Sequence, residues 1–79
     1  MKLPRELSGK ELCTLLKIFG YQITRQTGSH IRLTTELLGE HHITIPNHQS
    51  LKIGTLNIIL NDVSIHLKIE KQKLIKKLF

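Results

Sequence analysis

The 79-residue sequence contains one cysteine, Cys13, and no apolar run near the roughly 20 residues that a transmembrane helix needs. A single thiol excludes an internal disulfide and fits a reducing compartment. Cys13 lies in an apolar helical segment without a charged group placed to lower its pKa, so we expect a buried, unreactive thiol. The first residues also lack the apolar stretch of a signal peptide. These absences predict a cytoplasmic chain with no membrane segment.

Metal-ligand patterns are missing too, although the sequence has five histidines. His41 and His42 are neighbours and would point to opposite faces of a strand. No cysteine or carboxylate completes a set with them or with His48 at zinc-like spacing. We therefore expect no metal site, no small-molecule cofactor and no particular role for His66.

Acidic residues are scarce, since six Asp and Glu stand against twelve Lys and Arg, for a net charge of +6. Five of the lysines fall in the last twelve residues: Lys68, Lys71, Lys73, Lys76 and Lys77. Such an excess attracts polyanions, of which RNA and DNA are the commonest, although charge also serves solubility alone. With ordinary composition and neither a repeat nor a linker, residues 1–79 are expected to form one domain.

Helix signals stand at both ends of the sequence. Ser8 and Glu11 form a capping-box motif, which predicts a helix from about residue 9 to residue 19 that ends at Gly20. Apolar residues at spacings of three and four predict a second helix from residue 53 to about residue 67: Ile53, Leu56, Leu60, Val63 and Leu67. The segment VSIHLKI also alternates as a strand would, but the helical stripe is longer and starts earlier. A short last helix follows, capped by Glu70, with Leu74, Ile75 and Leu78 facing inward.

Three strands are predicted between the two main helices. The runs YQITRQT and HIRLTT flank a turn at Gly28 and Ser29, and the run HHITI follows a turn through Gly39 and stops at Pro46. Strands flanked by helices in this order predict an α+β fold with two layers, the helices covering one face of an antiparallel sheet.

Alternation along the strands predicts which side chains the helices leave uncovered. The apolar residues Ile31, Leu33, Ile43 and Ile45 should face the helices. His30, Arg32 and His42 should then share the open face. Arg25 alternates in phase with Tyr21 and Ile23, so we expect it to point inward near the end of its strand.

A basic surface with an outward imidazole suits one chemistry in particular. RNA is cleaved without metal when a base takes the 2′-hydroxyl proton, the freed oxygen attacks the phosphate, and an acid protonates the leaving 5′-oxygen. A histidine such as His30 fits either proton role, and arginine fits the stabilisation of phosphate charge. Three other interpretations remain open: a solvated turn histidine, a module that binds RNA without cutting it, and a basic face that docks an acidic protein.

Three segments carry a family resemblance: GYQITRQTGSH, ITIPNH and LKIGTLNIIL. In this order, over about residues 8–67, they resemble the HicA (YcfA-like) family of toxin–antitoxin mRNA interferases. The resemblance implies a double-stranded-RNA-binding-domain-like α-β-β-β-α fold and ribosome-independent cleavage of mRNA. It implies His30 as the catalytic residue and a HicB antitoxin that covers the active surface. Family members often carry a second histidine directly after the first, where this sequence has Ile31.

Further RNA contacts are expected around His30. The resemblance identifies Gly28 and Ser29 as the turn that presents the histidine, and His48 as the family's histidine near a proline. Arg25 and Arg32 are credible phosphate ligands, and the backbone N–H groups at a helix start beside Lys52, Gly54 and Thr55 suit an anion. Structural alternatives stand beside these roles: turn conformation for Gly28, capping of the next helix for His48, and entry into the helix for Gly54.

Overall fold

The computed structural model describes residues 3–79, and its first helix, α1 (Gly9–Leu15), begins where the capping box predicts. The Ser8 hydroxyl accepts a hydrogen bond from the Glu11 N–H at 3.0 Å, and the Ser8 N–H donates to the Glu11 carboxylate at 2.9 Å. The chain then tightens into a 3₁₀ turn, Leu16–Phe19, and stops at Gly20 with φ at 80°. The predicted segment is confirmed, except that its last turn is 3₁₀ rather than α, as is frequent at helix ends.

The predicted meander is confirmed as a three-stranded antiparallel sheet of strand order β1-β2-β3. Its strands are β1 (Gln22–Gln26), β2 (His30–Thr35) and β3 (His41–Pro46). Pro46, expected to stop β3, instead forms its last position opposite His30. A proline is tolerated there because a strand end has few ladder hydrogen bonds to lose. The β2–β3 turn passes through Leu38 and Gly39, both with positive φ.

Two helices complete the chain, α2 (Ile53–Leu67) and α3 (Lys71–Leu78), both as predicted. Most of the predicted apolar stripe of α2 is buried, but Ile53 is 44% exposed and Ile59 joins the core in its place. The first residue of a helix can leave the core because the chain enters from solvent. Glu70 occupies the position before α3, but its side chain makes no capping hydrogen bond.

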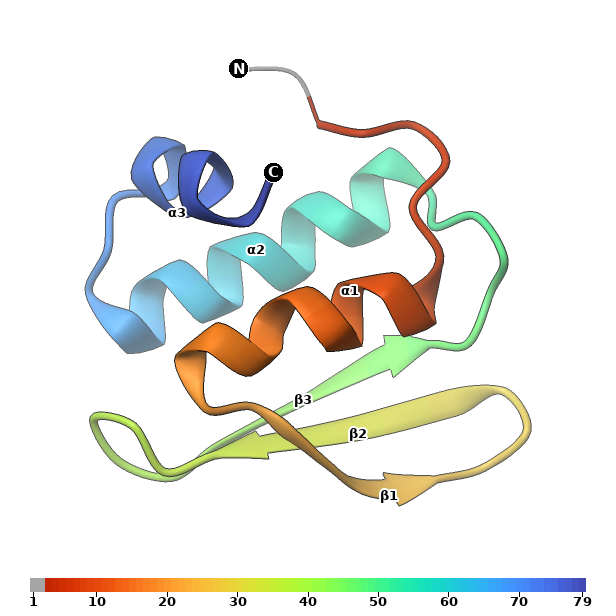
Figure 1. Ribbon diagram of the computed structural model, residues 1–79, viewed down its shortest axis with the longest axis horizontal. Helices are drawn as coiled ribbons and strands as arrows, with labels where there is room; N and C mark the ends of the chain where they lie inside the picture. The colour runs from red at the N-terminus through yellow and green to blue at the C-terminus, as the bar shows by residue number, and fades with distance from the viewer. Residues whose placement is uncertain (1–2) are drawn as a thin grey trace.

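The helices lie on one side of the sheet, as the predicted two-layer α+β class requires. In Figure 1, α1 and α2 run side by side above the strands, and α3 packs on α2 at the far side from the sheet. The buried side chains form one cluster that fills the space between the helices and the sheet and continues between α2 and α3, and Tyr21 is its largest fully buried residue. No helix of residues 3–79 covers the opposite face of the sheet (Figure 1), which leaves that face open.

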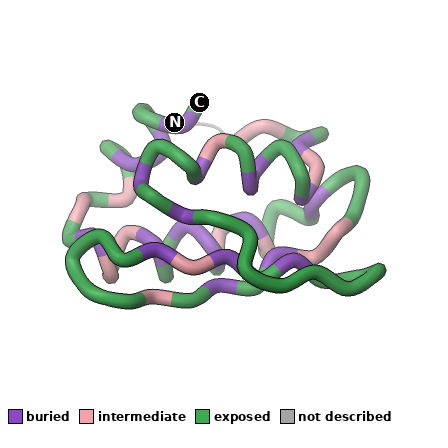
Figure 2. The backbone as a smooth tube through the Cα atoms, turned by 60° about the horizontal axis from the view of Figure 1, so that its bottom comes forward, coloured by how far each residue is buried: buried purple, intermediate pink, exposed green. Residues whose placement is uncertain are grey.

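The β1–β2 hairpin is the least protected part of the fold. Every residue from 22 to 30 is exposed, which Figure 2 shows as an unbroken exposed stretch of the tube. From residue 31 onward β2 alternates between buried and less buried positions, with Ile31 and Leu33 facing the helices. The sheet therefore places the start of β2, where His30 lies, at the boundary between an exposed hairpin and the packed core.

Candidate functional site

His30 is held at the start of β2 by a small network of hydrogen bonds from the backbone and side chains of Thr27 and Asn47. The Thr27 N–H donates to the His30 carbonyl at 2.9 Å, and the His30 N–H donates to the Thr27 hydroxyl at 3.2 Å. From the end of β3, the Asn47 N–H donates to the Ser29 carbonyl at 2.9 Å, and its side-chain amide donates to the Gly28 carbonyl at 3.3 Å. The turn is thus fixed on both sides, which limits where the His30 side chain can lie.

The His30 ring is exposed and has one described partner. Its Nδ1 lies 3.1 Å from the Ser29 hydroxyl oxygen. Within residues 3–79, Nε2 has no hydrogen-bond partner. Because a hydroxyl both donates and accepts, Ser29 can support either neutral tautomer of the ring. Nε2 is therefore the nitrogen available to a substrate, as a proton donor in one tautomer and an acceptor in the other.

Gly28 differs from its expected role in the turn. Its φ is not among the positive values of the chain, and a Cβ built at this position meets nothing within 4 Å. The alternative that turn conformation requires a glycine here is therefore wrong. The glycine leaves open space beside Ser29, which is compatible with close approach of a ligand to the backbone.

Arginine side chains extend the basic surface from His30 along the open face. Arg32 is two residues beyond His30 on the same face, roughly 7 Å along the strand. The expected inward direction of Arg25 is wrong, because a β-bulge between Ile23 and Arg25 shifts the register and sets Arg25 opposite Arg32. Gln26, the next residue, lines a pocket on the helix side of the sheet. The bulge therefore turns Arg25 to the open face, beside Arg32.

His42 also lies on the open face, as predicted, but at its other end. It pairs with Thr34, which is four residues, about 14 Å, from His30 along β2. The Thr34 hydroxyl lies 2.7 Å from His42 Nδ1, and Glu40 lies 2.9 Å from its Nε2. Glu36 and Glu40 flank the β2–β3 turn, so the acidic residues of the sheet gather away from His30. The open face thus has a basic end at His30 and an acidic end at His42.

The remaining predicted contacts lie off the open face. His48 follows β3 in an exposed loop, where its carbonyl accepts a hydrogen bond from the Gly9 N–H at 2.9 Å. It does not cap α2, because Lys52 occupies that position. Gly54 and Thr55 form the first turn of α2, in the helix layer at the same end of the molecule as the β1–β2 turn (Figure 1). The structure therefore places these residues near the His30 end, but in a different layer.

One cluster was missed by the sequence reasoning. His41, on the helix side of β3, has Nδ1 2.7 Å from the Tyr21 hydroxyl and Nε2 3.2 Å from Asp62. The His66 ring stacks on it with centroids 4.3 Å apart, and His66 Nε2 donates to the Leu37 carbonyl at 2.8 Å. Burial, with a smaller contribution from Asp62, raises the pKa of Tyr21 to about 12. The cluster joins β3 to α2 at the end of the sheet away from His30.

Cys13 is a buried free thiol, as expected. Burial raises its pKa, and the nearby Lys17, which the sequence reasoning did not place there, lowers it by less. No three histidine, cysteine or acidic side chains within residues 3–79 are grouped so that they could hold a metal ion. In the same part of the chain, every helix is too short or too polar to cross a bilayer.

Comparison with known proteins identifies the family. A family model described as the HicA toxin of bacterial toxin–antitoxin systems matches residues 9–65, from the start of α1 to near the end of α2, so that α3 lies outside the match. No curated protein and no solved structure matches the chain. Because the match covers most of the chain, in the predicted element order, the protein belongs to the HicA family of toxins of bacterial toxin–antitoxin systems.

Proposed function

We propose that this toxin is a metal-independent endoribonuclease that cleaves mRNA, with His30 as its acid–base residue. The observation that carries the proposal is the position of the His30 ring. It is exposed at the basic end of the open face, with Nδ1 at the Ser29 hydroxyl and Nε2 available to a substrate. The proposal includes a HicB-type antitoxin that covers this face, and action in the cytoplasm.

In the proposed reaction, neutral His30 has its proton on Nδ1, which donates to Ser29 Oγ. Nε2 then takes the proton from a ribose 2′-hydroxyl. The freed 2′-oxygen attacks the adjacent phosphorus, the bond to the 5′-oxygen breaks, and the products are a 2′,3′-cyclic phosphate and a 5′-hydroxyl end. A positioned acid–base group contributes about 10²–10⁴-fold to such a rate. The leaving oxygen takes its proton from His30 or from water.

Arg32 and Arg25 are proposed to stabilise the charge that develops on the phosphate. The bulge in β1 sets them opposite each other on the open face. Arg32 lies two residues beyond His30 on the same strand, β2. Guanidinium groups bind phosphate oxygens in a bidentate manner, so the pair suits a phosphate that gains charge in the transition state. Gly28, Ser29 and His48, together with Lys52, Gly54 and Thr55, are proposed to bind the RNA backbone on either side.

The test is RNA cleavage by purified protein in EDTA, comparing the parent with His30→Gln. His42→Gln is the matched control, since it changes the same residue type on the same face at the acidic end. We expect the RNA cleavage rate of His30→Gln to be lower than that of the parent by about 10²-fold or more, and that of His42→Gln to be unchanged. A substrate with 2′-deoxyribose at the cut position should resist cleavage. If the parent and folded His30→Gln both bind RNA and the parent does not cleave it, the protein is an RNA-binding module instead.

A further inference from the structure

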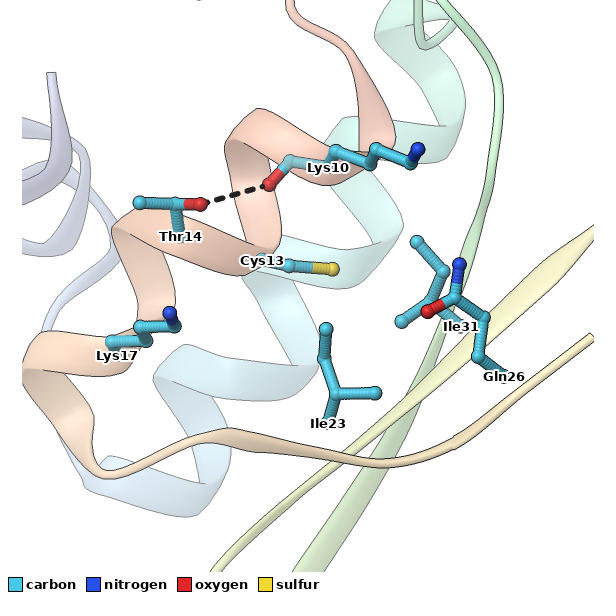
Figure 3. A pocket seen from close by; sticks show the side chains of 7 residues that line it. All are labelled: Lys10, Cys13, Thr14, Lys17, Ile23, Gln26 and Ile31. Carbon is cyan, nitrogen blue, oxygen red and sulfur yellow. Dashed lines mark hydrogen bonds between the residues drawn. The ribbon is translucent and has the colours of Figure 1, made fainter.

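A second surface feature lies on the helix side of the sheet, where the His30 face does not reach. A pocket of about 260 Å³ opens between α1 and the β1–β2 hairpin. In Figure 3, Cys13 directs its sulfur from α1 toward the strands, while Ile23 and Ile31 lie across from it. These three side chains give the pocket an apolar floor. Ile23 is 49% exposed on an edge strand, so part of this floor is open to solvent.

Two lysines stand at the ends of the pocket. Lys10 and Lys17 both extend from the first helical segment and are exposed (Figure 3). They are seven residues apart, which is roughly 10 Å along a helix. The nearest acidic residue of that helix, Glu11, is not part of the pocket lining and is engaged by Ser8 in the capping box. The polar side chains of Thr14 and Gln26 also line the pocket. An occupant therefore meets an apolar floor with polar groups at its sides and a positive charge at each end.

We propose that this pocket docks an acidic segment of a partner protein, with one aliphatic side chain in the pocket and one carboxylate at each lysine. The proposal goes beyond the nuclease function and does not depend on it. Toxins of this family have an antitoxin partner, which makes a protein the natural occupant. A segment bound here leaves the His30 face clear, so this contact is separate from any contact that covers the open face.

Size and chemistry favour a protein side chain over other occupants. The volume falls below the about 300–1,000 Å³ of typical small-molecule sites. No aromatic side chain lines the pocket, so an unpaired RNA base has nothing to stack on. The bulge between Ile23 and Arg25 interrupts the regular edge of β1, which disfavours addition of a further strand. Recognition here therefore depends on side chains rather than on a backbone ladder.

The spacing of the lysines specifies the segment. In an extended chain, residues i, i+2 and i+4 point to the same side, and i and i+4 lie about 13 Å apart. An acidic residue, an aliphatic residue and a second acidic residue at these positions would place the aliphatic group between two carboxylates. The lysine side chains are flexible enough to close the difference from roughly 10 Å. The inferred motif is acidic-x-aliphatic-x-acidic.

The experiment titrates ¹⁵N-labelled protein with the acetylated and amidated peptide SETLTES. We expect amide shifts confined to residues 10–17, 22–26 and 31. The double variant Lys10→Glu, Lys17→Glu should bind the peptide at least tenfold more weakly than the parent. The control Lys73→Glu, Lys76→Glu makes the same change in net charge on α3 and should bind within twofold of the parent. A peptide with serine in place of leucine should also bind the parent at least tenfold more weakly.

Several outcomes overturn the proposal. The first is no binding, and the second is shifts located on the open face or on α3. Equal losses from the two lysine pairs would indicate unspecific charge attraction. Shifts of the pocket residues by a single-stranded RNA oligonucleotide, but not by the peptide, would assign the pocket to nucleic acid. The titration measures binding and no cleavage, so failure of the nuclease proposal leaves this test intact.

Discussion

Gly9 is the residue whose replacement tests how the loop beside His30 is supported. A Cβ built on Gly9 would lie 2.1 Å from the Pro46 carbonyl oxygen and 3.2 Å from the Pro46 carbonyl carbon. The Gly9 N–H also donates to the His48 carbonyl at 2.9 Å. The start of α1 is therefore pressed directly onto the backbone that follows β3, at a distance that only glycine permits.

The cost of Gly9→Ala follows from this distance. A carbon and a carbonyl oxygen normally approach to about 3.3 Å, so a contact of 2.1 Å must open by about 1.2 Å. Overpacking of this kind costs about 1–3 kcal/mol, and backbone yields less easily than a side chain. Alanine is favoured over glycine in a helix by about 1 kcal/mol, which offsets part of the cost. Because the blocking atoms are backbone, we take the upper part of the overpacking range, about 2–3 kcal/mol, and expect a net destabilisation of about 1–2 kcal/mol.

The displacement should also reach the candidate site. Pro46 pairs with His30, and the next residue, Asn47, donates hydrogen bonds to the Ser29 and Gly28 carbonyls. Moving this backbone by about 1 Å would move the turn that positions the His30 ring. Because small displacements of catalytic groups cost about 10²-fold, RNA cleavage should fall by more than the loss of folded protein explains.

Thermal unfolding and RNA cleavage at a temperature where both proteins are folded would measure the two effects. For the thermal measurement Gly54→Ala is the matched control, because a Cβ there meets nothing within 4 Å and its φ is not positive. It is not a control for cleavage, because Gly54 is itself proposed to bind RNA. It should raise the free energy of unfolding by up to about 1 kcal/mol. If Gly9→Ala is as stable and as active as the parent, α1 can move off Pro46 without cost and the proposed support of the turn is wrong.

Three further substitutions give sharp expectations. Tyr21→Phe leaves His41 Nδ1 without its partner and should cost about 1–3 kcal/mol in a thermal melt. The Tyr21 pKa rises from 10.0 to about 12 on folding. The phenol therefore adds to the free energy of unfolding in full below pH 10, and this contribution is lost as the pH rises from 10 to 12. Tyr21→Phe should not show this loss. The Glu11 pKa is lowered from 4.5, mainly by its hydrogen bonds to Ser8. The parent should therefore lose stability as the pH is lowered from 4.5, and Glu11→Gln should lose less over the same range. Gly28→Ala should melt at the parent's temperature or slightly above it but bind RNA more weakly. Unchanged RNA binding would remove Gly28 from the interface.

Local signals were sufficient to predict most of the fold. The capping box at Ser8 and the glycine at residue 20 fix the first helical segment through hydrogen bonds between near neighbours. The apolar stripe of α2 is long enough to outweigh the strand-like alternation at its end, and the helix spans the predicted residues. These features depend on the identity of residues within one or two turns, which the sequence displays directly.

Contacts between distant segments could not be predicted in the same way. The clash that requires Gly9 joins residues 9 and 46, and no local pattern distinguishes this glycine from one that merely begins a helix. The His41 cluster depends on α2 crossing β3 so that Asp62 and His66 reach the same imidazole. The adjacent histidines at 41 and 42 did predict opposite faces, but their partners depend on how the layers pack.

Arg25 shows how one irregular residue changes the candidate site. Strict alternation from Tyr21 predicts an inward side chain, and this is correct as far as Ile23, which lines the pocket on the helix side. The bulge then adds one residue to β1 without a counterpart in β2, so that Arg25 stands opposite Arg32. An extra residue reverses the facing of every residue after it, because side chains alternate with a period of two. The same bulge therefore adds a second arginine to the open face and leaves Ile23 and Gln26 together on the helix side, where they line the proposed docking pocket.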